Sequence, residues 1–224
     1  CLPMQAQGET IGLMYFGART AEATHVGKHE MGTMRRIAEQ ISLALANLDL
    51  QQALKEQSIR DPLTKLHNRR YLEETLPREI ARMQRMDKKL GVMIMDIDHF
   101  KKVNDTYGHD GGDAVLVAFA SMLSQKVRKE DIACRLGGEE FVLILPDVTA
   151  DLAHARAQEI CEATRKLVIS HNGQKIAVSV SIGVCLYPDH GQGQDELFAR
   201  ADQCLYQAKN AGRDRVVMYD GTGV

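Results

Sequence analysis

The chain of 224 residues lacks any strong excess of charge of one sign. Its 28 lysines and arginines nearly balance 30 aspartates and glutamates, for a formal net charge of −2 at pH 7. Proteins that hold nucleic acid mainly through the phosphates carry a marked positive excess. The balance therefore excludes a general nucleic-acid binder and leaves room only for a local basic site.

Cysteine is scarce, and its distribution excludes two further classes of protein. The five cysteines are odd in number and form no C-x-x-C pair; they are Cys1, Cys134, Cys161, Cys185 and Cys204. Disulfide-stapled domains and structural zinc sites need paired or closely spaced cysteines, so neither is expected. The pattern predicts reduced thiols in the core of a cytoplasmic protein.

Long apolar runs, internal repeats and low-complexity segments are also absent. The longest uncharged stretch, residues 176–188, is too short and too rich in serine and glycine to span the ~30 Å of a bilayer. The chain opens CLPMQAQG, without an initial methionine or a basic signal region, so we expect it to begin inside a longer protein. Its 44% hydrophobic and 26% charged residues are ordinary globular usage, and its length indicates one full domain plus something smaller.

The smaller part precedes residue 60. Residues 10–16, between two glycines, predict a single strand without a visible partner, and residues 29–57 predict a long helix. Apolar residues recur at alternating steps of three and four, as in a coiled-coil seam; they are Met34, Ile37, Ile41, Ala44 and Leu48. A second stripe of Leu43, Leu50 and Leu54 runs out of phase with it. A helix packed on its own domain explains the seam equally well.

A second domain begins at Arg60-Asp61-Pro62, because proline disfavours helical geometry in the residue before it. We predict helices over 69–85, 111–127, 151–168 (capped by Asp151) and 195–210, and strands over 90–97, 132–136, 140–145, 176–184 and 216–219. This order indicates an α/β (α+β) fold with a ferredoxin-like βαββαβ core and a mixed central sheet, as in nucleotide cyclases and polymerase palms, preceded by the long helix.

Two acidic clusters stand at the ends of predicted core strands. Asp96-Ile97-Asp98 closes one strand, and Glu139-Glu140 opens another after the tight Gly137-Gly138 hairpin. If these strands are neighbours, the carboxylates repel one another unless a cation lies between them, and hard oxygen ligands favour magnesium or manganese. Either cluster alone is explained by solvation, but together they favour a metal and phosphate site.

Four ordered motifs identify a family. They are DPLTKLHNRR at 61–70, DIDHFKKVND at 96–105, GHDGGD at 108–113 and RLGGEEF at 135–141, and they strongly resemble GGDEF-domain diguanylate cyclases. On this resemblance, residues 59–224 form the catalytic domain. Residues 1–28 resemble the C-terminal end of a GAF sensor domain, and residues 29–58 a signalling helix.

The resemblance implies condensation of two GTP molecules into cyclic di-GMP with release of two pyrophosphates. The enzyme would be a homodimer joined through the N-terminal helix, with one GTP on each protomer and the two sites facing each other. By analogy, Asp96, Glu139 and the carbonyl of Ile97 would hold Mg²⁺ (or Mn²⁺). Glu140 would be a further ligand or a proton acceptor.

The resemblance also implies how the nucleotide is bound. Backbone N–H groups of a loop at His99, Phe100 and Lys101 would cradle the phosphates, with Lys101, Lys209 and Arg213 as cations. Asn104 and Asp113 would bind guanine. Without the resemblance, Lys209 and Arg213 would be basic residues favourable at a helix C-terminus and Asp113 an acid favourable at an N-terminus. Asp98 is expected to brace the loop, and His109 to have a structural role.

Arg128 and Asp131 match the family's R-x-x-D product-inhibition site; alone, this pattern is usually a solvated turn. Beside an active cyclase, two other functions stay open: a silent domain that binds GTP or cyclic di-GMP, and a dimerisation module. The intact GGEEF motif and Asp96 favour the enzyme. Neither nucleic-acid binding nor a membrane segment is expected.

Overall fold

The computed structural model describes residues 1–6, 9–15 and 28–221, and it divides the chain into two units, Cys1–Ser58 and Ile59–Val224. In the first unit, β1 (Leu2–Ala6) pairs antiparallel with β2 (Glu9–Met14). The prediction of a lone strand was therefore wrong; its last residue, Phe16, lies outside the described residues. β1 escaped detection because it is short, contains Pro3 and has no β-branched residue.

The predicted long helix is present as α1 (Lys28–Ile59). Ala38 and Ser42 are buried within this unit, whereas Ile37, Ile41 and Leu48 are exposed by 41%, 39% and 59%. The face that carries most of the predicted seam is thus not the face that the unit buries. No helix among the described residues has the length and apolar character needed to cross a membrane.

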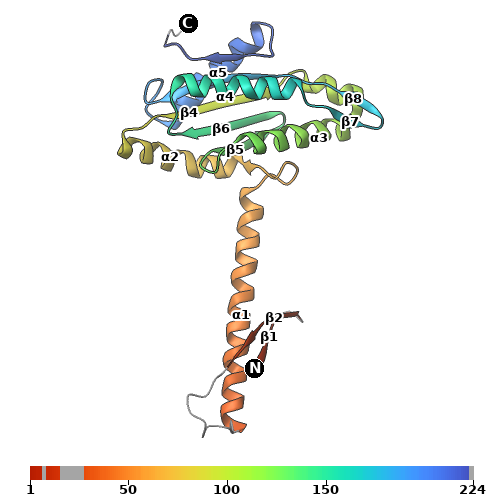
Figure 1. Cartoon of the computed structure of the whole chain (residues 1–224), viewed down its shortest axis with the longest axis vertical. Helices are drawn as coiled ribbons and strands as arrows, with labels where there is room; N and C mark the ends of the chain where they lie inside the picture. The colour runs from red at the N-terminus through yellow and green to blue at the C-terminus, as the bar shows by residue number, and fades with distance from the viewer. Residues whose placement is uncertain (7–8, 16–27, 222–224) are drawn as a thin grey trace. The chain divides into compact units, whose positions relative to one another are not determined.

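A mixed sheet organises the second unit (Figure 1). Its six strands run in the order β10 (Val216–Met218), β9 (Val180–Tyr187), β4 (Leu90–Ile97), β6 (Glu140–Pro146), β5 (Ile132–Gly137) and β3 (His67–Asn68). The two edge pairs, β10 with β9 and β3 with β5, are parallel, and the inner pairs are antiparallel. This is the predicted mixed sheet, with β3 added.

Two helices cover each face of the sheet. Met93, Met95 and Ile97 of β4 join the core formed with α3 (Phe100–Lys126) and α4 (Ala150–Arg165). Val92 and Ile94 alternate with them and join the core formed with α2 (Arg69–Met86) and α5 (Gln194–Asn210). Because both faces are covered, β4 is buried along its whole length and has the continuous apolar run seen in the sequence.

Two predicted boundaries were wrong. The N-cap of α4 is Thr149, whose hydroxyl accepts from the N–H of Leu152, and Asp151 lies in the first turn. The strand predicted over 176–184 is two strands: β8 (Gln174–Ile176) pairs with β7 (Ile169–His171) in a separate hairpin, and β9 starts at Val180. The carbonyl of Ser179, between them, accepts from the N–H of Asp98.

Gly183 of β9 provides a test of how closely α5 packs on the sheet. A Cβ atom there would lie 2.0 Å from the carbonyl oxygen of Ala201 and 2.4 Å from the nitrogen of Leu205, both backbone atoms of α5. We expect Gly183→Ala to lower the free energy of unfolding by at least ~2 kcal/mol, because a helix backbone cannot yield locally. Urea unfolding followed by circular dichroism measures the loss.

The matched control is Gly91→Ala on the neighbouring strand β4. Its added Cβ would meet first a side-chain methyl of Val148, at 3.1 Å, which can shift. We expect a change below ~1 kcal/mol there. Equal unfolding midpoints for the two variants would show that α5 is not held tightly against β9.

Candidate functional site

Strand register brings the two acidic clusters together at one end of β4. Asp96 is the cross-strand partner of Glu140, and the N–H of Ile97 donates to the carbonyl of Glu139 at 3.3 Å. Asp96 is 7% exposed, and its Oδ2 lies 2.7 Å from Nζ of Lys209 on α5. The predicted convergence of carboxylates at neighbouring strands is therefore present, and one predicted phosphate cation lies beside it.

The pKa of Asp96 reports the charge density at this strand end. Burial raises this pKa most, the Lys209 ammonium lowers it, and the nearby carboxylates of Glu139 and Glu140 raise it again, for a net upward shift. Three acids thus face a single ammonium group. Such a site gains from any further positive charge that a ligand or ion brings.

The turn that carries Glu139 depends on glycine and on an arginine that sequence reasoning missed. Gly137 and Gly138 have φ of 148° and 51°, which glycine adopts without strain. Nε and Nη2 of Arg135 donate to the carbonyl of Gly138 at 3.1 and 2.9 Å. Nη1 of the same side chain donates to both carboxylate oxygens of Asp61, at 3.1 and 3.3 Å.

Asp61 joins this hairpin to the segment that opens the second unit. Its Oδ1 also accepts from the N–H and the hydroxyl of Thr64, at 2.7 and 2.6 Å. Burial raises the pKa of Asp61, but these bonds and the Arg135 guanidinium outweigh it and lower the pKa below 3.8. Both residues stand inside the recognised motifs, yet their contact spans 74 positions, and neither sequence nor spacing indicates it.

The predicted phosphate loop is the start of a helix. His99 has φ of 57° and is the N-cap of α3, and Phe100 and Lys101 form its first turn. The first hydrogen bonds back to His99 come from Lys102 and Val103. Among the described residues no acceptor takes the N–H groups of His99, Phe100 and Lys101, which leaves them for an anion.

A break in α3 brings the two predicted guanine-binding residues toward each other. Gly108, with φ of 75°, interrupts the helix, so that its first half folds back on the second. A Cβ on Gly112 would lie 1.9 Å from Oδ1 of Asn104, which shows that the Asn104 amide rests directly on this glycine. Asp113 is the next residue, and its side chain is exposed. His109 is exposed as well.

Asp98 was expected to brace the loop at residues 99–101, but its side chain bonds instead to β9, the segment before it and the 213–214 segment. It is 4% exposed and accepts from the hydroxyls of Ser179 and Ser181 at 2.6 and 2.7 Å, and from the N–H of Asp214 at 3.0 Å. The last bond holds the segment that carries Arg213, where residues 213 and 214 both have positive φ. Arg213 thus comes to the same end of the sheet as Lys209.

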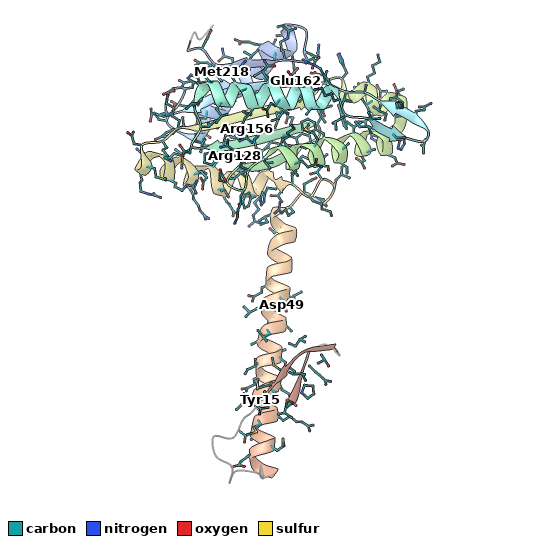
Figure 2. The ribbon with its side chains drawn as sticks, in the orientation of Figure 1. Tyr15, Asp49, Arg128, Arg156, Glu162 and Met218 are labelled. Carbon is teal, nitrogen blue, oxygen red and sulfur yellow. The ribbon has the colours of Figure 1, made fainter. Side chains whose placement is uncertain are left out.

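The R-x-x-D turn is more than a solvated loop (Figure 2). Oδ2 of Asp131 accepts from the N–H of Arg128 at 2.7 Å and lies 2.7 Å from Nη2 of Arg156 on α4. Arg156 also donates to the carbonyl of Lys126. The Asp131 side chain is 2% exposed, whereas Arg128 is exposed. The turn therefore presents Arg128 outward and holds Asp131 inward.

The donors at the end of β4 fit a hard divalent cation. They are two carboxylates, Asp96 and Glu139, and the carbonyl of Ile97, which are oxygen ligands of the kind that Mg²⁺ and Mn²⁺ prefer. Asp96 is buried beside Lys209 with the carboxylates of Glu139 and Glu140 nearby, and a divalent cation would offset this negative charge. Among the described residues, side chains alone form no group of three or more His, Cys, Asp or Glu placed to hold a metal ion.

Comparisons with known proteins agree with this geometry. Residues 58–215 match the family described as "Diguanylate cyclase, GGDEF domain". The chain is 42% identical over 168 residues to the response regulator PleD of Caulobacter vibrioides, covering 72% of this chain and 36% of PleD. It is 32% identical over 220 residues to diguanylate cyclase A of Treponema denticola, covering 97% of this chain and 58% of that protein. The chain thus spans about a third to three fifths of these relatives.

A solved structure is similar over most of the chain. The crystal structure of the coiled coil and GGDEF domain of DgcB from Caulobacter crescentus, in complex with c-di-GMP, superposes with a TM-score of 0.77 at 27% identity. The match covers 83% of this chain and 98% of that one. A mixed sheet with a preceding helix is therefore shared.

The Asp61 and Arg135 pair yields a test of what holds the hairpin. We expect Asp61→Asn, which keeps an acceptor for Thr64 and removes the charge, to lower the free energy of unfolding by about 1–2 kcal/mol at pH 7. Because the folded pKa lies below 3.8, this contribution is complete above that pH and is lost as the pH falls through the folded value. Urea unfolding between pH 7 and pH 3 should show that the free energies of unfolding of the parent and of Asp61→Asn approach each other at acid pH.

Asp147→Asn is the control, since its carboxylate pairs with Lys88 on the surface. An exposed pair of this kind contributes ~0–1 kcal/mol, so its loss should scarcely change the midpoint. If Asp61→Asn unfolds like Asp147→Asn at pH 7, the Arg135 contact does not stabilise the hairpin.

Proposed function

The chain belongs to the GGDEF family of diguanylate cyclase domains, and we propose on that premise that it condenses two GTP molecules into cyclic di-GMP and two pyrophosphates. The observation that carries the proposal is the register of Asp96 with Glu140 beside Lys209. It joins acidic groups, an ammonium group and free backbone N–H groups at one strand end. These are the parts that phosphoryl transfer needs, namely positioning and compensation of charge.

Divalent ions complete this site in the proposal. GGDEF cyclases generally use divalent metal ions, and here Asp96, Glu139 and the carbonyl of Ile97 would hold Mg²⁺ or Mn²⁺. When bound, such an ion neutralises the triphosphate and lowers the pKa of the 3′-hydroxyl that attacks the α-phosphate. Glu140, exposed beside them, would be a further ligand or accept the proton.

The residues around the carboxylates would bind and orient the triphosphate. The N–H groups of His99, Phe100 and Lys101 point from the start of α3, where the helix dipole adds positive potential. Lys209 already lies 2.7 Å from Asp96, so its ammonium can contact a phosphate without a large movement. Lys101 and Arg213 would supply the remaining positive charge.

Guanine selection is assigned to Asn104 and Asp113. A carboxylate can accept from the N1–H and the exocyclic amine of guanine, whereas adenine has no donor at N1. The break at Gly108 and the packing of Asn104 on Gly112 support this assignment, because they bring the amide next to Asp113. The place of Asp113 near a helix start is compatible with the same role.

A homodimer joined through α1 would bring two active sites face to face, so that each 3′-hydroxyl attacks the partner's α-phosphate. The exposed seam residues Ile37, Ile41 and Leu48 support this arrangement, since a second helix would cover them. Residues 1–28 are assigned to the end of a GAF-like sensor domain. A cytoplasmic location is proposed because Cys134, Cys161, Cys185 and Cys204 are buried free thiols, and disulfides are rare in that compartment.

A catalytically silent domain that binds GTP or cyclic di-GMP is the alternative. Such a domain would need the residues that bind guanine and phosphate but not a cluster of partly buried acids. Holding such acids near one another costs free energy. The buried Asp96 with Glu139 and Glu140 near it therefore favours the enzyme.

Removing a metal-binding carboxylate tests the catalytic proposal. We expect Glu139→Ala and Asp96→Ala each to lower turnover by at least about a hundredfold, because transition-state charge loses its compensation. Chromatography of the products from GTP and magnesium measures the rate, and circular dichroism checks the fold. Glu162→Ala, on α4, is the control and should keep parental activity (Figure 2). Near-parental turnover with Glu139→Ala would contradict the site.

Product inhibition at Arg128 and Asp131 has its own test. Because Asp131 is held inward by Arg156, the exposed Arg128 guanidinium would make the main contact with a phosphate or guanine edge. We expect Arg128→Ala to keep the initial rate and to raise the cyclic di-GMP concentration needed for half inhibition by at least about tenfold. Lys129→Ala, in the same turn, should change neither quantity. Unchanged inhibition in Arg128→Ala would show that the turn is ordinary surface.

A further inference from the structure

A cavity of about 570 Å³ opens beside the first half of α3, and of the residues assigned to the nucleotide only His99, through its N–H, also borders it. Its apolar lining comes from Val103 and Tyr107 of α3, from Ile176 at the end of β8, and from Ala177 and Val178 between β8 and β9. The volume lies within the range of small-molecule sites. A segment outside regular strands thus faces a helix across an open apolar space.

The cavity and the pair of Asp96 with Lys209 lie on opposite faces of the sheet at the end of β4. Asp96 alternates with Met95 and Ile97, which point into the core under α3 and α4. Asp96 instead pairs with Lys209 of α5, on the other face. The cavity is lined from the α3 and α4 side, so a ligand there would not compete for Asp96.

The charges around the cavity favour an anion. Lys102 lines it and has no ion pair among the described residues, and the exposed ring of His99 lines it as well. Arg165, at the end of α4, donates from Nε and Nη2 to Asp214, and its Nη1 takes no part in these bonds. The one acid in the lining, Asp98, is 4% exposed and already accepts three hydrogen bonds.

The same lining is bonded to the segment that carries Arg213. Asp98 and Arg165 are both lining residues, and both bind Asp214, through its N–H and its carboxylate respectively. Ser179, a third lining residue, donates to Asp98 at 2.6 Å. A ligand that contacts Arg165 is linked to Arg213 through Asp214, and one that contacts Ser179 is linked to it through Asp98 and Asp214.

We propose that this cavity binds a small carboxylate or phosphate that carries an apolar body, and that the bound ligand shifts the 213–214 segment. The anionic group contacts Lys102, His99 and the free edge of Arg165, while the apolar body lies on Val103, Tyr107 and Val178. The binding part stands on the cavity alone, whereas its effect on the nucleotide site rests on the proposed cyclase function.

The binding test uses 1-naphthoate as the anionic probe and 1-naphthalenemethanol as its neutral counterpart, with the full chain. Amide shifts in ¹H–¹⁵N spectra locate the probe. We expect saturable shifts at residues 99–107 and 176–179, and at least about tenfold weaker binding of the neutral compound, because it lacks the charge-assisted contact. Shifts confined to α1 or α2, or equal affinity for both compounds, would overturn the site.

Variants separate the pocket from general attraction of an anion. Lys102→Glu reverses one lining charge, and Ala177→Phe narrows the exposed mouth; each should weaken 1-naphthoate binding at least about tenfold. Arg78→Glu, which makes the same charge change on α2, should bind like the parent. If both pocket variants bind 1-naphthoate with the affinity of the parent, the proposal is contradicted. This holds even if one of the two new side chains packs differently from expectation.

The coupling has a separate readout. At saturating 1-naphthoate we expect the amides of Arg213 and Asp214 to shift and the KM for GTP to change at least about threefold, with both effects lost in Lys102→Glu. If 1-naphthoate binds without shifting these amides, the coupling is refuted, while the proposal of a binding pocket stands. A chain that makes no cyclic di-GMP would refute the cyclase function, while the amide shifts would still decide the pocket.

Discussion

The register of β4 is the constraint on which the functional end of this protein depends. β4 is antiparallel to both neighbours, which sets Asp96 opposite Glu140 on one side and Ser181 on the other. A shift by one residue would turn Met93, Met95 and Ile97 out of their core and move Asp96 to the wrong face. The apolar cores on the two faces therefore hold the carboxylates together against their mutual repulsion.

Three buried or half-buried acids surround that strand end, and each is used in a different way. Asp96 pairs with Lys209 and lies near the carboxylates of Glu139 and Glu140, which suits it to a cationic ligand. Asp61 pairs with Arg135, accepts from Thr64 and holds the hairpin in place. Asp98 accepts from hydroxyl and N–H donors and serves as a brace. Asp96 is suited to chemistry, whereas Asp61 and Asp98 are suited to holding the structure rigid.

Glycine permits the close approaches that this arrangement requires. The GGEEF turn needs positive φ at Gly137 and Gly138, so the carbonyl of Gly138 can meet Arg135. In α3, the break at Gly108 and the bare Cα of Gly112 leave room for the Asn104 side chain. At the hairpin a Cβ would meet no other atom and the positive φ is the constraint, whereas at Gly112 a Cβ would displace the Asn104 amide.

Local chemistry in the sequence determined which helices and strands form and which residues make up most of the site. The apolar run of β4, the helical periodicity of α2 and the glycine hairpin were all predicted, because each depends on neighbours within one element. The motifs also indicated the residues that meet at the strand end. The N-cap of α4 was missed, since Thr149 and Asp151 can each cap a helix and only backbone geometry selects one. The start of α3 at Phe100 was missed as well, because Gly108 interrupts the helix.

Only the tertiary structure decided which distant groups meet. The contact of Arg135 with Asp61, the pair of Arg156 with Asp131 and the bonds that join Asp98 to Asp214 each link residues far apart in the chain. Their existence depends on how strands and helices pack, which composition and spacing do not encode locally. The same holds for the interruption between β8 and β9, where Ser179 leaves the strand pattern to bond with Asp98. Sequence therefore specified the chemical groups, and packing specified their partners.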